Sequence, residues 1–406
     1  MSALIVGFEA LLRRHLPGTV PRYLQLISGE EMSRTLPAPL RDEFLGRQRL
    51  PVTMEGARDR LHQLHEADAV VYLGDFTHMA FHQRVVAARL VAQHLVESPA
   101  QAEALTARFH FLVDAPDAAL ARVVVLGGTL QFDRLRDEFD AVHQQRLRRL
   151  VTGAADVTMR DPESALRVAE LRSDFERSFL GVDNATLLQR EDAAALPRSA
   201  WTANPDAGRG CIGLFFGRAS RPLERLRDCA ADLARALQCG VHWLPWGMSR
   251  GYHELAYRVL PPPEVRGLPE DGQYPLPGDL YELLGRYRCV LTDTYHVAVV
   301  AWSLGVPAVC IAHSRSDLGV DVSCGPLFAW RDKRQTFYSS CQALDFFVHA
   351  VELDTPEAWS ARLAHLVRVL GDARFTDAVA GRVRRHAEAA GQRAAAALRR
   401  CFALSA

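Results

Sequence analysis

Short apolar runs recur along this chain and alternate with segments of helical spacing. Examples are ADAVVYLG (67–74) and ARVVVLGG (121–128) in the first half and CVLTD (289–293) in the second. Such runs are typical of strands buried on both faces of a parallel sheet, and their alternation with helices indicates that helices cover the sheet. The chain is therefore predicted to adopt an α/β fold.

The alternation occurs twice, with one interruption. Residues 191–210 are polar and rich in Pro, Gly and Asn, which predicts an interdomain linker. The length of 406 residues also suits two domains, at roughly 100–200 residues per domain. We therefore predict a Rossmann-like N-terminal domain over 1–190, a Rossmann-like C-terminal domain over 211–345, and C-terminal helices over 346–406.

Doubly wound sheets bind ligands at the carboxyl ends of their strands. If the two sheets face each other, those ends converge on one central cleft. The active site is therefore expected in that cleft, with the N-terminal domain on the acceptor side and the C-terminal domain on the donor side.

The pattern also assigns individual elements. The predicted strands cover residues 67–74, 121–128, 155–161, 210–216, 240–246, 289–293 and 307–313. The predicted helices cover residues 3–15, 55–66, 78–96, 133–151, 162–171, 221–238, 250–260, 279–287, 295–305 and 356 to the end. Residues 261–279 are predicted to be a loop, because their prolines are incompatible with regular structure.

Composition argues against several classes of protein. Lys and Arg together number 48, as do Asp and Glu, so the net charge is zero, whereas nucleic-acid-binding domains usually carry a basic surface. No apolar run approaches the roughly 20 residues that span a bilayer. The N-terminal segment has its apolar run before its basic pair, the reverse of a signal peptide. We expect a soluble cytoplasmic protein that binds no nucleic acid and contacts a membrane at most peripherally; the sequence predicts no oligomeric state.

The cysteines and the single lysine limit the chemistry. All eight cysteines lie in the second half and none forms a C-x-x-C pair, which argues against a zinc ribbon or a thioredoxin motif and fits a reducing cytosol. Lys333 is the only lysine. A phosphate in the active site is therefore expected to be held by arginine, histidine or backbone N–H groups.

The segment CVLTDTYHVAVVAWSLG (289–305) is the strongest candidate site. A predicted strand ends at Asp293, and a predicted helix begins near Tyr295, with His296 in its first turn. The backbone N–H groups of Tyr295 and His296 at such a helix start favour an anion, and the imidazole can bind phosphate or donate a proton. The alternative, which is equally compatible with the residues, is that Asp293 only caps the helix and His296 packs in the core.

This segment resembles the C-terminal signature of the polysaccharide pyruvyl transferase family. The resemblance rests on a strand, the pattern TD-x-x-H, an apolar helix that ends in G-V-P, and a further strand. Family members commonly carry Arg-Leu-His where this chain has Thr294, Tyr295 and His296, and some relatives carry Ser-Phe-His or Ser-Tyr-His. The chain therefore resembles the subtype without the arginine.

Two further segments are similar to motifs of the same family. VTMRDPESALRVAEL (157–171) resembles an RD-x-x-S segment, in which Arg160 and Asp161 end a strand and Ser164 lies in the next helix. Arg160 can bind a phosphate bidentately, or it can pair with an aspartate to stabilise the turn, which is the more frequent role of such pairs. GVDNATLL (181–188) resembles a D-P-A-x-L-L segment before the linker.

The end of the first predicted strand carries candidate acceptor contacts. Asp75, Thr77 and His78 follow Gly74 where the family usually has a glycine cluster. Asp75 is a candidate base, and Thr77 and His78 are candidate ligands of an acceptor sugar. His78 and His82 have a spacing that can bind metal, but a third ligand is not evident, so no metal site is predicted.

Two arginines follow other strand ends in the second half. Arg315 lies near the position at which the family often has a lysine, and Arg218 follows the strand GLFFG. Both are candidate phosphate ligands, together with Thr294. Either arginine can instead be a solvated surface side chain, as arginines usually are.

The resemblance implies a GT-B-like enzyme that moves the enolpyruvyl group of phosphoenolpyruvate onto a sugar or lipid-linked glycan, with no metal or other cofactor. In this mechanism His296 serves as acid or phosphate ligand, and Asp75 or Asp293 acts on the acceptor hydroxyl. Two alternatives stay open. The chain can be a GT-B-type glycosyltransferase that uses a nucleotide sugar, because fold does not determine function, or a catalytically silent glycan-binding relative.

Overall fold

The computed structural model describes residues 2–24, 61–130, 141–196, 198, 210–218, 222–246, 275–312 and 332–405. The chain forms two compact units. Unit 1 comprises Met1–Ala10 and Ala185–His386, and unit 2 comprises Leu11–Asn184 and Ala387–Ala406. The division after residue 184 lies close to the predicted domain end at 190. Both chain termini, however, group with the unit that holds the opposite half of the sequence.

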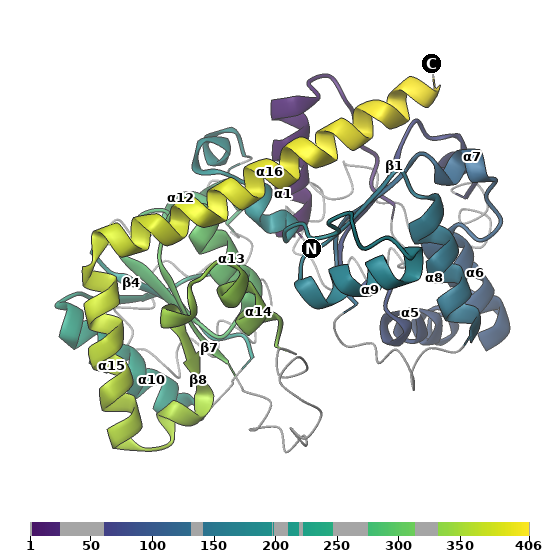
Figure 1. Ribbon diagram of the computed structural model, residues 1–406. Coiled ribbons are helices and arrows are strands. Elements are labelled where there is room, and N and C mark those ends of the chain that lie inside the picture. The colour runs from purple at the N-terminus through teal and green to yellow at the C-terminus, as the bar shows by residue number, and fades with distance from the viewer. Residues whose placement is uncertain are drawn as a thin grey trace. The chain divides into compact units, whose positions relative to one another are not determined.

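Unit 2 is built on a three-stranded parallel sheet in the order β1-β2-β3 (Figure 1). Its strands are β1 (Val70–Asp75), β2 (Val123–Gly128) and β3 (Asp156–Met159). Its helices are α5 (Ala80–Ala92), α6 (Pro99–Phe111), α7 (Asp117–Leu120), α8 (Ala141–Gly153) and α9 (Pro162–Arg172). All six residues of β2 are buried, which explains why the central strand reads as a continuous apolar run rather than an alternating one.

Unit 1 is built on a five-stranded parallel sheet in the order β5-β4-β6-β7-β8. Its strands are β4 (Ile212–Phe215), β5 (Val241–Trp243), β6 (Cys289–Thr292), β7 (Ala308–Ala312) and β8 (Phe347–His349). Its helices are α10 (Leu223–Leu237), α12 (Pro277–Leu284), α13 (Tyr295–Ser303), α14 (Lys333–Ser340) and α15 (Pro356–Gly371), with short 3-10 turns at Asn184–Leu187, Arg190–Ala195, Leu344–Phe346 and Ala350–Leu353.

The strand order of unit 1 reverses between β4 and β6. From β4 the chain passes through α10 to β5 on one side, whereas from β6 it passes through α13 to β7 and then β8 on the other. Because parallel crossovers are right-handed, the two directions place α10 and α13 on opposite faces of the sheet, as Figure 1 shows. Such a reversal is the topological switch point of a doubly wound sheet.

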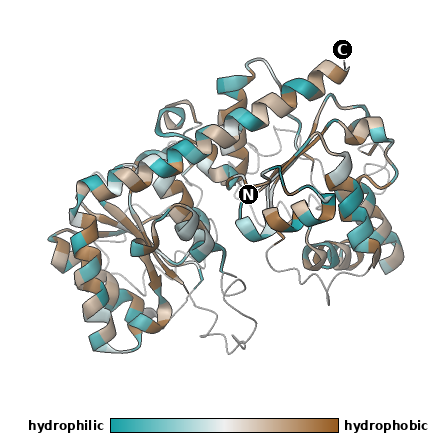
Figure 2. Cartoon of the chain, in the orientation of Figure 1, coloured by the Kyte–Doolittle hydropathy of each residue, from teal (hydrophilic) through white to brown (hydrophobic). Residues whose placement is uncertain are grey.

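Hydropathy follows this layering within each unit. The strands are predominantly apolar, whereas α10 and α15 present polar residues on one side (Figure 2). Helix α13 differs, because every residue from Val297 to Trp302 is buried. An all-round apolar helix of this kind belongs in the interior of a sheet protein rather than at its surface.

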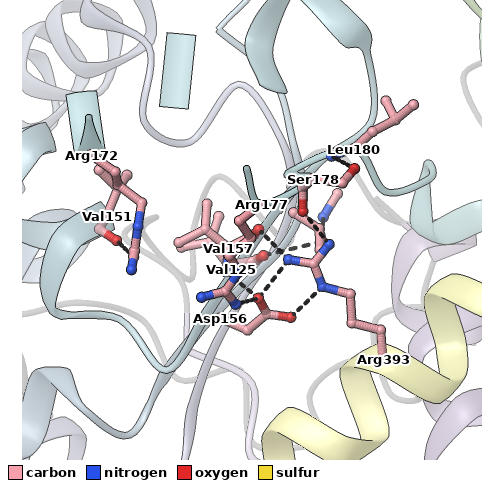
Figure 3. A network of polar contacts seen from close by, with 11 residues as sticks. Val125, Val151, Asp156, Val157, Arg172, Arg177, Ser178, Leu180 and Arg393 are labelled. Carbon is pink, nitrogen blue, oxygen red and sulfur yellow. Dashed lines mark hydrogen bonds and ion pairs between the residues drawn. The ribbon is translucent and has the colours of Figure 1, made fainter. Parts of the chain in front are cut away.

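Two long helices have residues in both units. Helix α1 (Ser2–His15) and helix α16 (Ala373–Ser405) each cross a boundary between the units. In unit 2, the Arg393 side chain of α16 donates to both carboxylate oxygens of Asp156 at 2.9 and 2.8 Å. Asp156 is 1% exposed at the start of β3 and also accepts from Arg177; Figure 3 shows the two guanidinium groups on one carboxylate.

The predicted α/β class with parallel sheets is confirmed, as are the helix at 3–15 and those that follow β3, β4 and β6 in the sequence. The predicted loop over 261–279 is wrong at its end, because α12 begins at Pro277; proline is tolerated in the first helical turn. Helix α6 and the elements α14 and β8 were not predicted. The predicted helix over 250–260 lies outside the described residues. In the described part of the chain, no helix combines the length and the apolarity that a membrane span needs.

Candidate functional site

The carboxyl ends of β4 and β6 meet at the switch point of unit 1. Asp293 follows β6 directly and is fully buried. Its carboxylate accepts hydrogen bonds from the backbone N–H groups of Gly217, at 2.8 Å, and Arg218, at 3.2 Å. The hydroxyl group of Thr294 donates to the same carboxylate at 3.1 Å. Asp293 therefore ties the chain after β4 to the chain after β6, and this geometry favours a positioning role over an acid–base role.

Gly217 is required by this close approach. A Cβ atom at residue 217 would lie 2.9 Å from Oγ1 of Thr294 and 2.8 Å from the Phe215 ring. Both distances are shorter than carbon contacts allow, so a larger residue would push the β4 end away from the β6 end. The glycine after the strand GLFF was not among the predicted site residues; its place directly after a buried strand was the signal.

Helix α13 starts at this junction. Thr294 is its N-cap residue but makes no side-chain cap hydrogen bond to the helix. Tyr295 is buried, and His296 is half-buried beside it, with the two ring centroids 5.1 Å apart. The positive end of the helix dipole lies at this terminus, so the junction combines an imidazole with an environment that favours anions.

Lys333 lies at the same place, and the sequence did not predict it. Its Nζ atom is 4.9 Å from the centroid of the Tyr295 ring. Helix α14 thus brings the single lysine of the chain beside α13, a neighbour that the expectation of arginine, histidine and N–H ligands did not include. The residue lies 37 positions after His296, so no local motif links the two.

Arg334 connects α14 to the same turn. Its Nη1 atom donates to the backbone carbonyl of Asp293 at 2.7 Å, and its Nε atom donates to Asp332 at 2.9 Å. Burial disfavours the guanidinium charge, but the hydrogen bonds and charge of Asp332 outweigh it and raise the pKa of Arg334 above its usual value. Arg334 is thus permanently charged and holds the β6–α13 turn in place.

The remaining predicted ligands of unit 1 are less constrained. The Arg218 side chain is exposed, although its backbone N–H is held by Asp293. Arg315 lies outside the described residues. Thr294 donates to Asp293 and also accepts from the N–H of Gly217 at 3.2 Å, so its hydroxyl stabilises the junction.

The RD-x-x-S segment of unit 2 forms a closed polar cluster. Arg160 and Asp183 form an ion pair at 3.0 Å, and both side chains are almost completely buried. Asp161 caps α9 by accepting from the N–H of Ser164 at 2.8 Å, and it also accepts from the hydroxyl groups of Ser164 and Thr129. Arg160 thus forms an Arg–Asp pair, the arrangement that the sequence gave as the alternative to a phosphate contact.

The third family-like segment joins the same cluster. The Asn184 amide donates to the carbonyl of Leu126 at 2.9 Å. Gly127 has a φ of +67°, and a Cβ atom there would lie 2.5 Å from the carbonyl oxygen of Val182. The LGG turn, the RD-x-x-S turn and the GVDNATLL segment therefore converge in space, and they do so by bonding to one another.

His78 has the surroundings of a core histidine. It is 4% exposed, its Nε2 atom lies 3.1 Å from the carbonyl oxygen of His110, and its ring packs edge-on against Tyr72. Burial lowers the pKa of His78 to about 3, as it does for His110. The imidazole is therefore neutral at physiological pH and poorly placed to contact a sugar.

The other candidates near β1 are only partly visible. Thr77 donates to the carbonyl of Gly74 at 3.2 Å and is half-buried. Asp75 ends β1, but its side chain lies outside the described part of the molecule. Among the side chains that the structure describes, no group of three or more His, Cys, Asp or Glu residues is arranged to hold a metal ion.

Comparison with known proteins gives one family match. The model of the family described as polysaccharide pyruvyl transferase matches residues 100–315. This range includes both the closed cluster of unit 2 and the β4–β6 junction of unit 1. No curated protein matches the chain.

Several solved structures are weakly similar. UDP-GlcNAc 2-epimerase from Neisseria meningitidis bound to UDP-GlcNAc has 10% identity and a TM-score of 0.48, over 96% of this chain and 94% of that one. A putative UDP-N-acetylglucosamine 2-epimerase from Listeria monocytogenes has 12% identity and a TM-score of 0.41, over 96% and 94%. The calicheamicin glycosyltransferase CalG4 has 15% identity and a TM-score of 0.38, over 98% and 94%. These similarities are too weak to assign a ligand.

Proposed function

The chain belongs to the polysaccharide pyruvyl transferase family and is a transferase, and we propose that it moves the enolpyruvyl group of phosphoenolpyruvate onto a sugar or lipid-linked glycan to form a pyruvate ketal. The observation that carries the proposal is the β4–β6 junction. There the strand order reverses, α13 begins without a side-chain cap, and His296 is half-buried in its first turn. Doubly wound sheets bind ligands at such a point.

The donor places defined demands on this site. Phosphoenolpyruvate carries a phosphate and a carboxylate, which need cations or N–H donors. The first turn of α13 supplies N–H groups and a favourable dipole, and Arg218 supplies an exposed guanidinium group after β4. The rigid tie between Asp293 and the backbone of Gly217 and Arg218 keeps these groups together.

The reaction needs an acid and two acceptor hydroxyl groups. In the proposed sequence, His296 donates a proton to the methylene carbon of the donor, which generates a cation at the neighbouring carbon stabilised by its oxygen. One acceptor hydroxyl attacks that carbon, and a second then displaces inorganic phosphate, which closes the ketal. Histidine is the side chain that most often serves as a general acid near neutral pH.

The acceptor hydroxyl is best deprotonated by a base near the acceptor. Asp75, at the end of β1 in unit 2, is our candidate for this role. Asp293 is less suitable, because its carboxylate is fully buried and already accepts hydrogen bonds from two backbone N–H groups and one hydroxyl group. The proposed reaction uses no metal and no redox cofactor.

The first test is donor binding. Phosphoenolpyruvate at 100 times its Kd should stabilise the protein by about 2.7 kcal/mol, because it binds only the native state, and this appears as a rise in Tm. A rise with a UDP-sugar but not with phosphoenolpyruvate would instead support a nucleotide-sugar glycosyltransferase. Sugar binding without phosphate release from any acceptor would support a silent glycan-binding protein.

The second test is catalytic. His296→Gln should lower phosphate release from phosphoenolpyruvate and a glycan acceptor by about 10²- to 10⁴-fold, the usual contribution of a general acid. Its far-UV circular dichroism and Tm should stay close to those of the wild type, since residue 296 as a whole is only partly buried and glutamine is similar in size. Near-normal turnover of this variant would reject His296 as the acid.

A further inference from the structure

The end of α1 meets the last turns of α16 within unit 2. Arg399 of α16 donates a hydrogen bond to the backbone carbonyl of His15, the final residue of α1, at 2.8 Å (Figure 1). Burial lowers the pKa of His15, and the positive charges of Arg14 and Arg399 lower it further. The two helices therefore bring their arginines to one place, although the residues are far apart in the sequence.

Arginines are exposed at the ends of both helices. Arg13 and Arg14 are exposed in the last turn of α1, and Arg399 and Arg400 are exposed near the end of α16. Glu388 is the last acidic residue of α16, so the remaining turns of that helix carry no negative side chain. The local charge is therefore positive, although the net charge of the chain is zero.

Helix capping accounts for only part of this charge. The Arg399 guanidinium reaches the carbonyl end of α1, where the helix dipole favours a cation. In the part of the chain that the structure describes, no carboxylate forms an ion pair with Arg13 or Arg400. The charges of these two side chains thus face solvent and are accessible to a partner outside the chain.

An exposed apolar side chain adjoins these charges. Leu404, in the last turn of α16, is 65% exposed. It lies four positions after Arg400, so the two side chains share one face of the helix. The other side of the helix packs into unit 2, because Cys401 is buried and the Ser405 hydroxyl group donates to the carbonyl of Asp68 at 3.3 Å. The outer face of α16 thus combines positive charge with an apolar side chain.

We propose that the exposed ends of α1 and α16 dock unit 2 on a membrane surface that carries anionic lipid headgroups. This docking surface comprises Arg13, Arg399, Arg400 and Leu404. It is distinct from the β4–β6 junction of unit 1 and does not depend on the proposed donor. A lipid-linked acceptor would be reached from the same membrane.

The chemistry of the docking surface favours a lipid surface over a nucleic acid. Guanidinium groups bind phosphate oxygens in both partners, and basic side chains are attracted to the negative potential of an anionic membrane. Leu404 distinguishes the two, because an apolar side chain of an interfacial helix enters the boundary between headgroups and acyl chains. The backbone of a nucleic acid offers no such apolar layer.

Vesicle binding tests the proposal. The full chain should co-sediment with vesicles of phosphatidylcholine that contain about one-third phosphatidylglycerol, and only weakly with vesicles of phosphatidylcholine alone. Because salt screens charges at a surface, this binding should weaken as the ionic strength rises. If the wild type does not bind the anionic vesicles at low ionic strength, the proposal is overturned.

Substitutions locate the contact on the protein. Arg13→Gln and Arg400→Gln should each weaken binding to the anionic vesicles by about 5-fold, the effect of one basic residue near a charged membrane. Arg148→Gln is the matched control, because it neutralises an exposed arginine on α8 of the same unit, and it should bind like the wild type. An equal loss in all three variants would mean that overall charge causes the attraction, and the assignment to this surface would fail.

The Leu404→Trp variant measures the depth of the contact. Brominated lipids in the anionic vesicles should quench its additional fluorescence relative to the wild type, which has six tryptophans. Phe175→Trp is the control, because Phe175 is 68% exposed at another place in unit 2, and its additional fluorescence should not be quenched. Equal quenching of the two variants would contradict insertion of residue 404.

Two further measurements separate this proposal from its alternatives. If a DNA duplex bound more tightly than the anionic vesicles, and Arg13→Gln and Arg400→Gln weakened that binding, the surface would serve a nucleic acid and the membrane proposal would be overturned. The thermal shift caused by phosphoenolpyruvate should be the same in these variants and the wild type. A wild type that binds anionic vesicles but not phosphoenolpyruvate would support the docking surface and reject the proposed donor.

Discussion

The turn between β6 and α13 and the turn between β3 and α9 share a local design but use their polar groups differently. Each follows a buried strand, and each precedes a helix. At the β3–α9 turn, Asp161 caps the helix and Arg160 is buried against Asp183. At the β6–α13 turn, the helix has no side-chain cap, and His296 and Lys333 lie at its start.

The topology of the two sheets differs at these two turns. The strand order of unit 1 reverses between β4 and β6, so neighbouring helices leave the junction on opposite faces. The three described strands of unit 2 follow one another without a reversal, and three polar segments converge there and bond to each other. The polar groups of the β3–α9 turn thus bind partners within unit 2, whereas the β6–α13 turn lies where the strand order reverses.

The largest expected effect concerns the β3–α9 turn. Arg160→Met leaves the buried Asp183 carboxylate without its cation and should lower the free energy of unfolding by about 3–5 kcal/mol, measured by urea denaturation. Arg108→Met, which removes an exposed partner of Asp114 in the same unit, should cost no more than about 1 kcal/mol. If Arg160→Met instead keeps full stability and loses phosphoenolpyruvate binding, the contrast between the two turns fails.

The buried histidines of unit 2 should make the stability of the fold depend on pH. Burial lowers the pKa of His78 and His110 to about 3, below the value of about 6.5 in the unfolded chain. The unfolded chain therefore takes up more protons, and the stability that is complete above pH 6.5 is lost as the pH falls towards 3. Between pH 7 and 5.5 the loss should be about 2 kcal/mol for the two groups together.

Two variants check this assignment. His78→Gln should halve the acid-induced loss of stability that is measured by denaturation at several pH values. His62→Gln, which alters a histidine side chain that is 71% exposed, should leave the pH dependence unchanged. An unaltered slope in His78→Gln would mean that His78 is protonated in the folded state.

The smallest expected effects are losses of stability when a side chain at the start of α9 or α13 is removed. Asp161→Ala removes a cap and should cost about 0.5–2 kcal/mol. Thr294→Ala removes hydroxyl contacts to Gly217 and Asp293 but no cap, so it should cost no more than about 1 kcal/mol. Equal losses in the two variants, measured by denaturation, would indicate that Thr294 caps α13 in solution.

Much of the fold follows from local pattern. The apolar runs at 121–128 and 289–293 could be recognised as strands, because strands that are buried on both faces consist almost entirely of apolar residues. Pro162 starts α9, because its missing N–H costs nothing in the first helical turn. Helix α6 was missed although Ser98 and Pro99 form a regular start. Strand β8 was missed because three residues carry too little periodicity to distinguish a strand from a turn.

The candidate site was predicted only in part. Asp293, Thr294, Tyr295 and His296 are consecutive, so their placement after a buried strand could be read from the sequence. The engagement of Asp293 by the N–H groups of Gly217 and Arg218 could not, because more than seventy residues separate the partners. His78 was assigned to an acceptor site, although neighbours from α6 enclose it in the core.

The sequence by itself determined the α/β class, the strand-to-helix turns and the residues that lie within them, because these depend on hydrophobic periodicity and on the preferences of single residues. Only the tertiary structure decided which partner each polar group in these turns contacts. The reason is that hydrogen bonds and ion pairs in a packed interior join residues that are distant in the sequence, such as Asp183 with Arg160 and Gly217 with Asp293.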